Sequence, residues 1–138
     1  MRAAGDGSPV ALAQKLFQGM KAHDGAAVSS LFVPGLTLSS VDANGKVSVT
    51  SGEEFAKRVG SSKADWLERI WDPKVLEHGS IAVVWAEYDF HLNGKFSHCG
   101  IDTFTMLKGD TGWKIASLSF TRETSGCSPS PLGPPPAQ

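Results

Sequence analysis

Two turn motifs constrain the fold of this chain more than any other feature, because they join three long segments of strand-forming residues. Asn93-Gly94 favours a two-residue type I′ turn, which fixes the register of the hairpin that it closes. Residues 109–112, Gly-Asp-Thr-Gly, form a second turn whose register is less definite. Residues 81–123 therefore predict three consecutive antiparallel strands, around which the rest of the chain is organised.

The turns also predict which side chains oppose one another in this sheet. Side chains alternate between the two faces of a strand, so the register sorts them into two faces. Outward from the first turn, the predicted pairs are Leu92–Lys95, Phe90–Ser97, Asp89–His98, Glu87–Gly100 and Trp85–Asp102. Across the second turn, the predicted pairs are Lys108–Trp113, Met106–Ile115, Phe104–Ser117 and Asp102–Ser119.

The two predicted faces differ in their chemistry. One is apolar or small throughout and contains Ala82, Val84, Ala86, Tyr88, Phe90, Cys99, Ile101, Thr103, Leu107, Ala116, Leu118 and Phe120. The other is graded, with an apolar end of Ile81, Val83, Trp85, Phe104, Met106, Trp113 and Ile115, and a polar end of Glu87, Asp89, His91, His98, Asp102, Ser117, Ser119 and Thr121. We expect a dimer to cover the first face, because soluble proteins avoid large exposed apolar patches. The graded face would then curl around the helices and enclose a pocket.

Shorter elements precede this sheet and supply the helices. Ser8 and Asp24 are typical helix N-caps, and Pro9 suits the first helical position. The run Ser-Gly-Glu-Glu at residues 51–54 is a capping box. In chain order, the expected elements are a helix at residues 8–22, a helix at 24–32, a hairpin at 36–50, a helix at 51–60 and an extended segment at 64–77.

The length of 138 residues suits a single domain. We assign it to residues 8–124, between a disordered N-terminal tail at residues 1–7 and a disordered C-terminal tail at residues 125–138. Five prolines in the last ten residues are typical of such a tail. Cys99 and Cys127 favour two reduced thiols, with a single disulfide as the alternative if the protein is exported.

Charge and hydropathy exclude several classes of partner. A net charge of −1 gives no electrostatic basis for binding nucleic acid or an anionic membrane. No apolar run approaches the roughly 18 residues of a membrane span, and the N-terminus lacks the apolar core of a signal peptide. We therefore expect a cytoplasmic protein with neither nucleic acid nor membrane as its partner. Export is the alternative, if a signal peptide has been removed.

The order of these elements resembles the nuclear transport factor 2-like superfamily. Within it, the runs His-Cys-Gly-Ile-Asp-Thr-Phe at 98–104 and Gly-Trp-Lys-Ile at 112–115 are similar to the SnoaL-like or putative lumazine-binding branch. The resemblance covers about residues 8–124 and implies an α+β fold. In it, a cone-shaped, curved antiparallel β-sheet wraps around N-terminal helices, an arrangement also called a cystatin-like α+β barrel. Members commonly dimerise through the outer face of the sheet, which implies a homodimer here.

Three residues are candidates for catalysis: Asp102, His98 and Asp89. Asp102 is predicted to face Trp85, so burial would raise its pKa toward the range useful for proton transfer. The alternative is a carboxylate that only shapes the pocket, hydrogen-bonded to Ser119 or to a backbone N–H. Asp89 and His98 could be a base with its orienting partner, or an ordinary cross-strand charge pair.

The other polar and aromatic residues predict a small-molecule pocket. We expect its ligand to contact Trp85, Glu87, Phe104, Phe17, Phe32, Ser117 and Ser119. A metal could in principle be held on the graded face by Glu87, Asp89, His91 and His98, but the chain has no recognised metal-binding spacing, so neither a metal nor a cofactor is predicted. Tyr88 is predicted on the opposite face, which argues against the oxyanion-holding tyrosine of a steroid isomerase.

Three functions are compatible with these observations. The superfamily includes isomerases, polyketide cyclases, epoxide hydrolases, dehydratases and transport adaptors, so the resemblance alone fixes none of them. The first hypothesis is a protein that binds a small apolar or aromatic ligand inside the cone. An alternative is a cofactor-independent acid–base enzyme, an isomerase, cyclase or dehydratase, that uses Asp102 with help from His98 or Asp89. A second alternative is a dimeric interaction module without a ligand.

Overall fold

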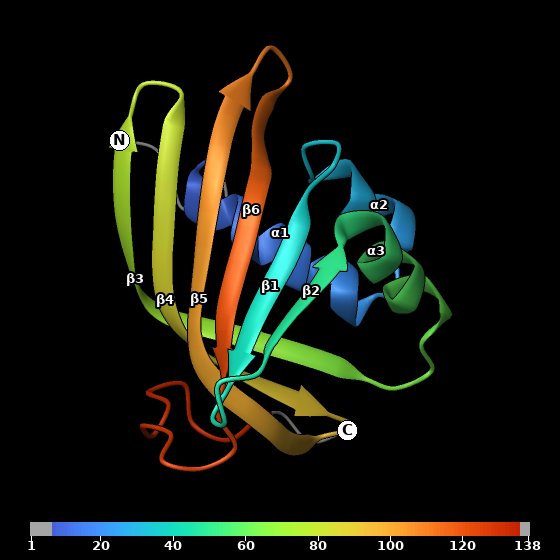
Figure 1. The fold of residues 1–138 in the computed structure, drawn as a ribbon, viewed down its shortest axis with the longest axis vertical. Helices are drawn as coiled ribbons and strands as arrows, with labels where there is room; N and C mark the ends of the chain where they lie inside the picture. The colour runs from blue at the N-terminus through green and yellow to red at the C-terminus, as the bar shows by residue number, and fades with distance from the viewer. Residues whose placement is uncertain (1–6, 136–138) are drawn as a thin grey trace.

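The structure is a computed structural model that describes residues 7–135. This part of the chain contains three helices and six strands (Figure 1). In chain order they are α1 (Pro9–Lys21), α2 (Gly25–Ser30), β1 (Thr37–Asp42), β2 (Val47–Ser51), α3 (Gly52–Ser61), β3 (Trp66–His78), β4 (Ile81–Leu92), β5 (Lys95–Gly109) and β6 (Gly112–Arg122). None of these helices is long and apolar enough to cross a membrane. Residues 1–6 and 136–138 of the two predicted tails lie outside the described residues.

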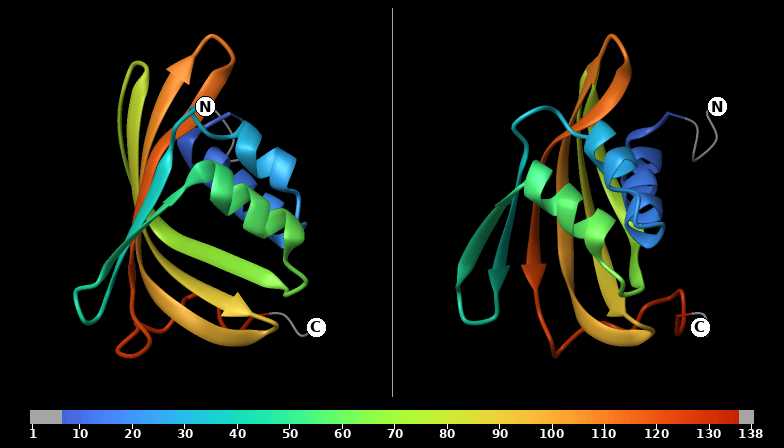
Figure 2. Two further views of the ribbon diagram at one scale, coloured as in Figure 1. Left: turned by 45° about the vertical axis from the view of Figure 1, so that its right-hand side comes forward. Right: turned by 90° about the vertical axis from the view of Figure 1, so that its right-hand side faces the viewer.

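The six strands form one curved sheet in the order β2-β1-β6-β5-β4-β3. Neighbouring strands are antiparallel except β1 and β6, which run parallel. The three helices lie together on the concave side of the sheet, and β3, β4 and β5 curve beneath them (Figure 2). This arrangement confirms the predicted α+β fold, in which a curved sheet wraps around the N-terminal helices.

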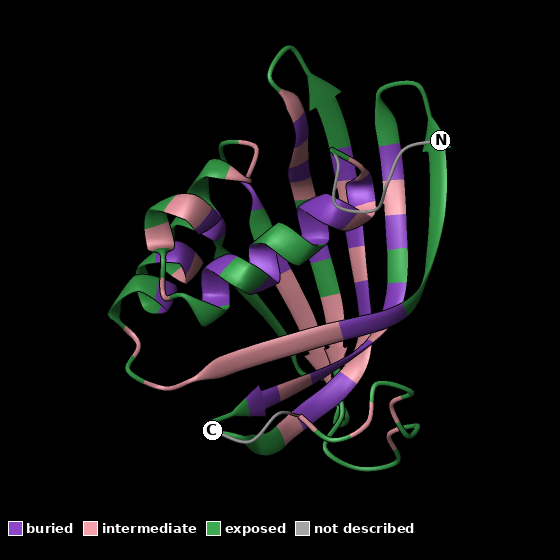
Figure 3. Ribbon diagram, turned by 180° about the vertical axis from the view of Figure 1, so that it is seen from behind, coloured by how far each residue is buried: buried purple, intermediate pink, exposed green. Residues whose placement is uncertain are grey.

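The helices begin at the predicted caps. The Ser8 hydroxyl accepts a hydrogen bond from the Ala11 N–H at 3.1 Å, and Asp24 and Ser51 cap α2 and α3 in the same way. Buried and exposed positions alternate along α1, whose buried face points to the sheet (Figure 3). Each large apolar side chain on that face contributes about 1.5–3 kcal/mol of burial free energy. The side chains concerned are Leu12, Leu16, Phe17 and Met20.

A β-bulge changes the register of β4 against β5. Leu92 pairs with Lys95, as predicted from the first turn. The register then shifts between Phe90 and His91, so that Phe90 opposes His98 instead of Ser97. All pairs predicted beyond this bulge are wrong by one residue, and Trp85 opposes Thr103 instead of Asp102.

A second bulge has the same effect between β5 and β6. Met106 pairs with Ile115, as predicted from the second turn. The register shifts between Thr105 and Met106, so that Phe104 opposes Leu118 instead of Ser117. Beyond this point Asp102 opposes Phe120, and the predicted pair with Ser119 is wrong.

The bulges overturn the predicted assignment of faces, because a one-residue slip turns every later side chain to the other face. Four of the five β4 residues that were expected in a dimer interface belong to the core and are at most 1% exposed: Ala82, Val84, Ala86 and Tyr88. The fifth, Phe90, is partly buried against the same core. On β5, the predicted graded-face residues are also buried: His98, Asp102, Phe104 and Met106. The inner face therefore combines the apolar residues of β4 with the graded residues of β5.

The C-terminal segment is attached to the sheet by a disulfide. Cys127 is bonded to Cys99 of β5, so the prediction of two reduced thiols is wrong. Residues 124–135 contain no helix or strand, but many of them line a cavity with Arg69 and His91. Leu132 lies farther along, in a second cavity beside α1. The disulfide and these cavities place described residues of the segment against the sheet and α1.

Candidate functional site

A cavity of about 490 Å³ lies inside the cone, between α1, α3 and the concave face of the sheet. Its volume falls within the range of about 300–1,000 Å³ that is common for small-molecule sites. Much of the wall is apolar and includes Leu16, Phe17, Met20, Phe55, Trp66 and Leu118. The titratable and charged groups of the wall are Arg58, Glu68, His98, Asp102 and Arg122.

Asp102 is the most deeply buried charged residue of this wall, at 2% exposure. Side chains two residues apart in a strand share a face, so Asp102 points inward with Phe104 and Met106, which are both fully buried. Its Oδ2 atom has no hydrogen-bond partner among the described residues. A buried polar atom without a partner carries a free-energy cost of about 1–3 kcal/mol, which a ligand or a shared proton can relieve.

Glu68 of β3 brings a second carboxyl group close enough to Asp102 for the two groups to influence each other's ionisation. Burial raises the pKa of Asp102 well above its ordinary value, and the charge and hydrogen bond of Glu68 raise it further. Burial also raises the pKa of Glu68. Two enclosed carboxyls in contact cannot both ionise easily, so the pair shares a proton over a pH range in which isolated carboxyls are ionised.

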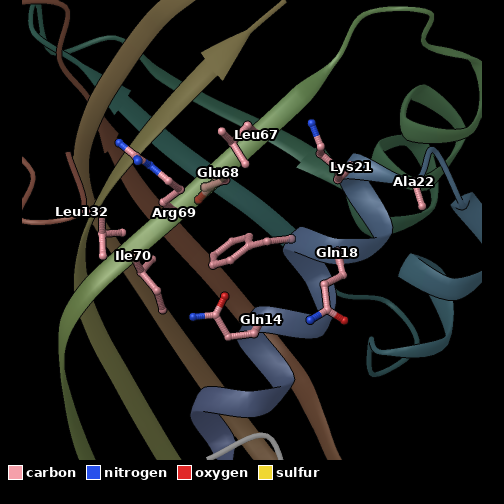
Figure 4. Close-up of a pocket in the computed structure, with 10 residues that line it drawn as sticks. Gln14, Gln18, Lys21, Ala22, Leu67, Glu68, Arg69, Ile70 and Leu132 are labelled. Carbon is pink, nitrogen blue, oxygen red and sulfur yellow. The ribbon is translucent and has the colours of Figure 1, made fainter. Parts of the chain in front are cut away.

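Sequence analysis gave Glu68 no role, although a signal was present. Glu68 lies two residues from Trp66 and from Ile70 in β3, so the three side chains share one face. That pattern places Glu68 on the inner face, between an aromatic and an aliphatic side chain. Figure 4 shows Glu68 on β3 at the cavity that separates this strand from α1. That second cavity, of about 510 Å³, shares Glu68 and Phe17 with the cavity inside the cone. Glu68 therefore lies where the two cavities adjoin.

His98 lines the same cavity as Asp102, and its imidazole is neutral at pH 7. Burial, followed by the nearby charge of Arg122, lowers its pKa to about 4. Its Nδ1 atom lies 2.9 Å from the Ser97 hydroxyl, and its ring centroid lies 5.1 Å from that of Phe90. A neutral imidazole has one donor and one acceptor nitrogen, so His98 can offer a ligand one polar contact.

Tyr88 faces the inside of the cone, so its predicted placement on the opposite face is wrong. Its ring packs edge-on against His98 and Phe120, with centroid distances of 5.8 and 6.2 Å. Its hydroxyl donates a hydrogen bond to the Thr121 carbonyl, and burial raises its pKa. The Thr121 carbonyl thus holds this proton, and Tyr88 is not among the residues that line the cavity.

Asp89 and His98 do not form the predicted pair. The Asp89 carboxylate accepts hydrogen bonds from Nε of Arg69 at 2.9 Å and from Nη2 at 2.6 Å. Nε2 of His91 lies 3.3 Å from the same carboxylate. These groups adjoin the C-terminal segment, outside the cone, so Asp89 takes part in a structural ion pair. Among the described residues, no three histidine, cysteine, aspartate or glutamate side chains are grouped to hold a metal ion.

The residues expected to contact a ligand divide between the two sides of the sheet. Phe17 lines the cavity, and Phe104 lies beneath it with 6.3 Å between the ring centroids. Phe32 packs against Phe55 of the cavity wall at 6.5 Å. The other four lie on the outer face, because the predicted register of β4, β5 and β6 was wrong by one residue; Trp85 on that face is 49% exposed. Those four are Trp85, Glu87, Ser117 and Ser119.

Comparison with known proteins agrees with this architecture. A family model described as "Putative lumazine-binding" matches residues 10–121. Comparison with curated protein sequences found no match. Among solved structures, an NTF2-like protein of unknown function from Shewanella baltica is 19% identical, with a TM-score of 0.62 over 84% of this chain and 91% of that one.

Two further structures are similar at the level of the fold. A protein described as a putative dehydratase of the NTF2-like family, from Streptomyces avermitilis, is 17% identical, with a TM-score of 0.64 over 83% of this chain and 93% of that one. A protein of unknown function from Mycobacterium tuberculosis is 14% identical, with a TM-score of 0.68 over 92% of this chain and 78% of that one. At these identities the likeness establishes a shared fold and leaves function to be argued from the site.

Proposed function

The chain belongs to the putative lumazine-binding family, and from this premise we propose that it binds a small, largely apolar or aromatic molecule inside the cone. The observation that supports this proposal most is the position of Asp102, whose unpartnered Oδ2 atom lies at an otherwise largely apolar cavity. A few polar groups in an apolar enclosure are the usual composition of a ligand site. The ring of the ligand would pack against the aromatic wall while a polar atom meets the carboxyl pair.

The pair of Glu68 and Asp102 would accept a hydrogen bond from the ligand. While the shared proton joins the two carboxyls to each other, the free Oδ2 atom of Asp102 can accept from an N–H or O–H group of the ligand. The surrounding apolar wall strengthens this hydrogen bond, because it excludes competing water. His98, neutral and 9% exposed, would supply a second polar contact.

Acid–base catalysis is a second candidate function, favoured by the raised pKa values of the two carboxyls. A carboxyl that titrates closer to neutral pH exchanges protons with a substrate more readily than an ordinary carboxylate. In this scheme Asp102 removes a proton from the substrate and passes it to Glu68. The proton then returns through Asp102 to another atom of the substrate. Such a transfer would serve an isomerisation or a dehydration.

We expect Thr50→Trp to weaken binding of a neutral aromatic probe, naphthamide, by about tenfold or more, which corresponds to about 1.4 kcal/mol. Thr50 lines the cavity from β2, so an indole at this position would occupy space that the probe needs. Binding would be followed by the NMR chemical shifts of the Leu16, Met20 and Leu118 methyl groups.

The neighbouring substitution Val49→Trp is the matched control. Val49 is 63% exposed and its side chain points to the opposite face of the same strand. This variant should bind naphthamide as the wild type does. Absence of methyl shifts in the wild-type protein, or equal weakening by both substitutions, would contradict a ligand site inside the cone.

A homodimer through the outer face of the sheet is a further part of the proposed function. Trp85 lies in a shallow groove of about 280 Å³ on this face, with Val47, Ile101 and Thr103. Trp85 and Val47 are 49% and 65% exposed. Neighbouring exposed apolar side chains of this kind are typical of protein interfaces. The expected interface thus involves the face that carries Trp85, and not the apolar β4 residues that the sequence suggested.

We expect Trp85→Asp to raise the dissociation constant of this dimer by about 100-fold, because a buried aromatic residue at the centre of an interface commonly dominates its free energy. Sedimentation velocity over a concentration series would measure it. Lys15→Asp, which changes an exposed residue of α1 on the helical side of the sheet, should leave the dimer intact. A wild-type protein that stays monomeric at high concentration would refute the dimer.

We also place the protein in an oxidising compartment, because Cys99 and Cys127 are bonded and disulfides persist mainly in such compartments. This favours the exported alternative over the cytoplasm. Native protein treated with an alkylating reagent before any reduction should show no modified cysteine by mass. Modification of both cysteines would indicate a reducing compartment.

A further inference from the structure

We propose that the ligand of the cone carries an anionic group, a carboxylate or a phosphate, which Arg58 and Arg122 bind at the mouth of the cavity. This inference rests on the proposed function and adds the chemical class of the ligand. Arg58 lies on α3 and Arg122 at the end of β6, and both line the cavity that contains Asp102. Two arginines that line one cavity from separate elements are the charged groups there that suit an anion, since guanidinium groups bind carboxylate and phosphate oxygens in pairs.

Neither arginine has a carboxylate partner among the described residues. The ion pairs of this part of the chain join Lys21 to Asp65, and Arg69 and His91 to Asp89. Both arginines are largely exposed, which keeps their guanidinium groups available to a ligand. An arginine that lines a cavity without a protein partner can therefore interact with the anion without first breaking an ion pair.

The acidic residues nearest to Arg122 in the sheet are engaged elsewhere. Asp42 is its partner in the register of β1 and β6, but the Asp42 carboxylate accepts hydrogen bonds from the N–H groups of Asn44 and Lys46. Glu123 follows Arg122 in sequence, and its carboxylate accepts a hydrogen bond from the Thr121 hydroxyl. The positive charge of Arg122 acts instead on the cavity, where it contributes to the low pKa of His98.

The rest of the cavity suits a ligand with one charged end. Its wall near β1 and β2 also includes three hydroxyl-bearing residues, Ser40, Ser48 and Thr50. Asp102 and Glu68 would repel an anion if both were ionised, but a pair that shares a proton carries less negative charge. An aromatic acid could therefore place its ring on the apolar wall, its anionic group at the arginines and another polar atom at Asp102.

Three probes with the same ring test this inference: naphthamide, naphthoate and naphthyl phosphate. We expect at least one of the two anions to bind the wild-type protein about tenfold more tightly than naphthamide, as charge-assisted hydrogen bonds at a partly exposed site allow. The double variant Arg58→Gln, Arg122→Gln should lose this preference and bind the two anions no more tightly than naphthamide. Titration calorimetry at two salt concentrations would show a salt dependence for the anion alone.

The control is Lys57→Gln, which removes the same charge from the adjacent position of α3, outside the cavity wall. It should keep the preference for the anion. The anion that binds more tightly identifies the group as carboxylate or phosphate. Equal binding of all three probes, or loss of the preference in Lys57→Gln as well, would overturn the anion site and leave the ligand cavity standing. If none of the three binds, the proposed ligand function fails together with this inference.

Discussion

Replacing Asp102 by asparagine should stabilise the protein at neutral pH by at least about 1 kcal/mol, although it removes a group that we place in the binding site. In the folded state, burial and Glu68 raise the pKa of Asp102 well above its ordinary value of 3.8. Between that value and the raised folded pKa, the folded state holds a proton that the unfolded state has lost. The wild type therefore loses about 1.4 kcal/mol of stability for each pH unit across this window.

The amide of asparagine does not titrate, so the variant should show a flatter dependence of stability on pH than the wild type. The stabilisation should be absent below about pH 4, where the carboxyl is protonated in both states, and should grow as the pH rises. Urea unfolding at a series of pH values would measure both proteins. Asp110→Asn in the exposed β5–β6 turn is the control, and its stability should stay within about 0.5 kcal/mol of the wild type. Destabilisation by Asp102→Asn at all pH values would mean that the carboxylate is a structural acceptor.

Replacing both cysteines by serine should lower the free energy of unfolding by about 3.5 kcal/mol, the loop-closure contribution expected for this loop. Cys99 and Cys127 are 28 residues apart, and the bond between them reduces the conformational entropy of the unfolded chain, which stabilises the folded state. The same change should free residues 124–135 from the sheet, so limited proteolysis should remove this segment faster from the variant.

Denaturant unfolding of the wild type with and without a reducing agent is the matching control for the cysteine variant. Reduced wild type should be about as unstable as the double serine variant. If reduction leaves both the stability and the proteolysis of the C-terminal segment unchanged, the bond does not hold this segment in solution.

The local features of the fold were predictable because each depends on a few neighbouring residues. The caps at Ser8, Asp24 and Ser51 and the turn at Asn93-Gly94 are examples. The bulges were missed because no turn signal marks them. A physical signal did exist in the apolar residues of β4 and in Phe104 and Met106 of β5, which can face one core only if the register shifts by one residue.

The candidate site depends on contacts that a sequence pattern does not reveal. Sequence analysis singled out Asp102 and His98, and the structure brings both to the cavity inside the cone. Glu68 was missed because β3 and β5 are not neighbours in the sheet. Their side chains meet only because the sheet curves, and the alternation of polar and apolar residues does not encode the degree of curvature.

Carboxyl carbon NMR titration distinguishes a proton shared by Asp102 and Glu68 at the ligand cavity from two carboxylates that ionise independently. With aspartate and glutamate labelled at the carboxyl carbon, and Asp102→Asn and Glu68→Gln used for assignment, the chemical shift of Asp102 should report a pKa well above 3.8. Binding of a ligand in the cavity should then shift this titration. A titration of Asp102 near 3.8, unaffected by Glu68→Gln, would contradict the shared proton and the function built on it.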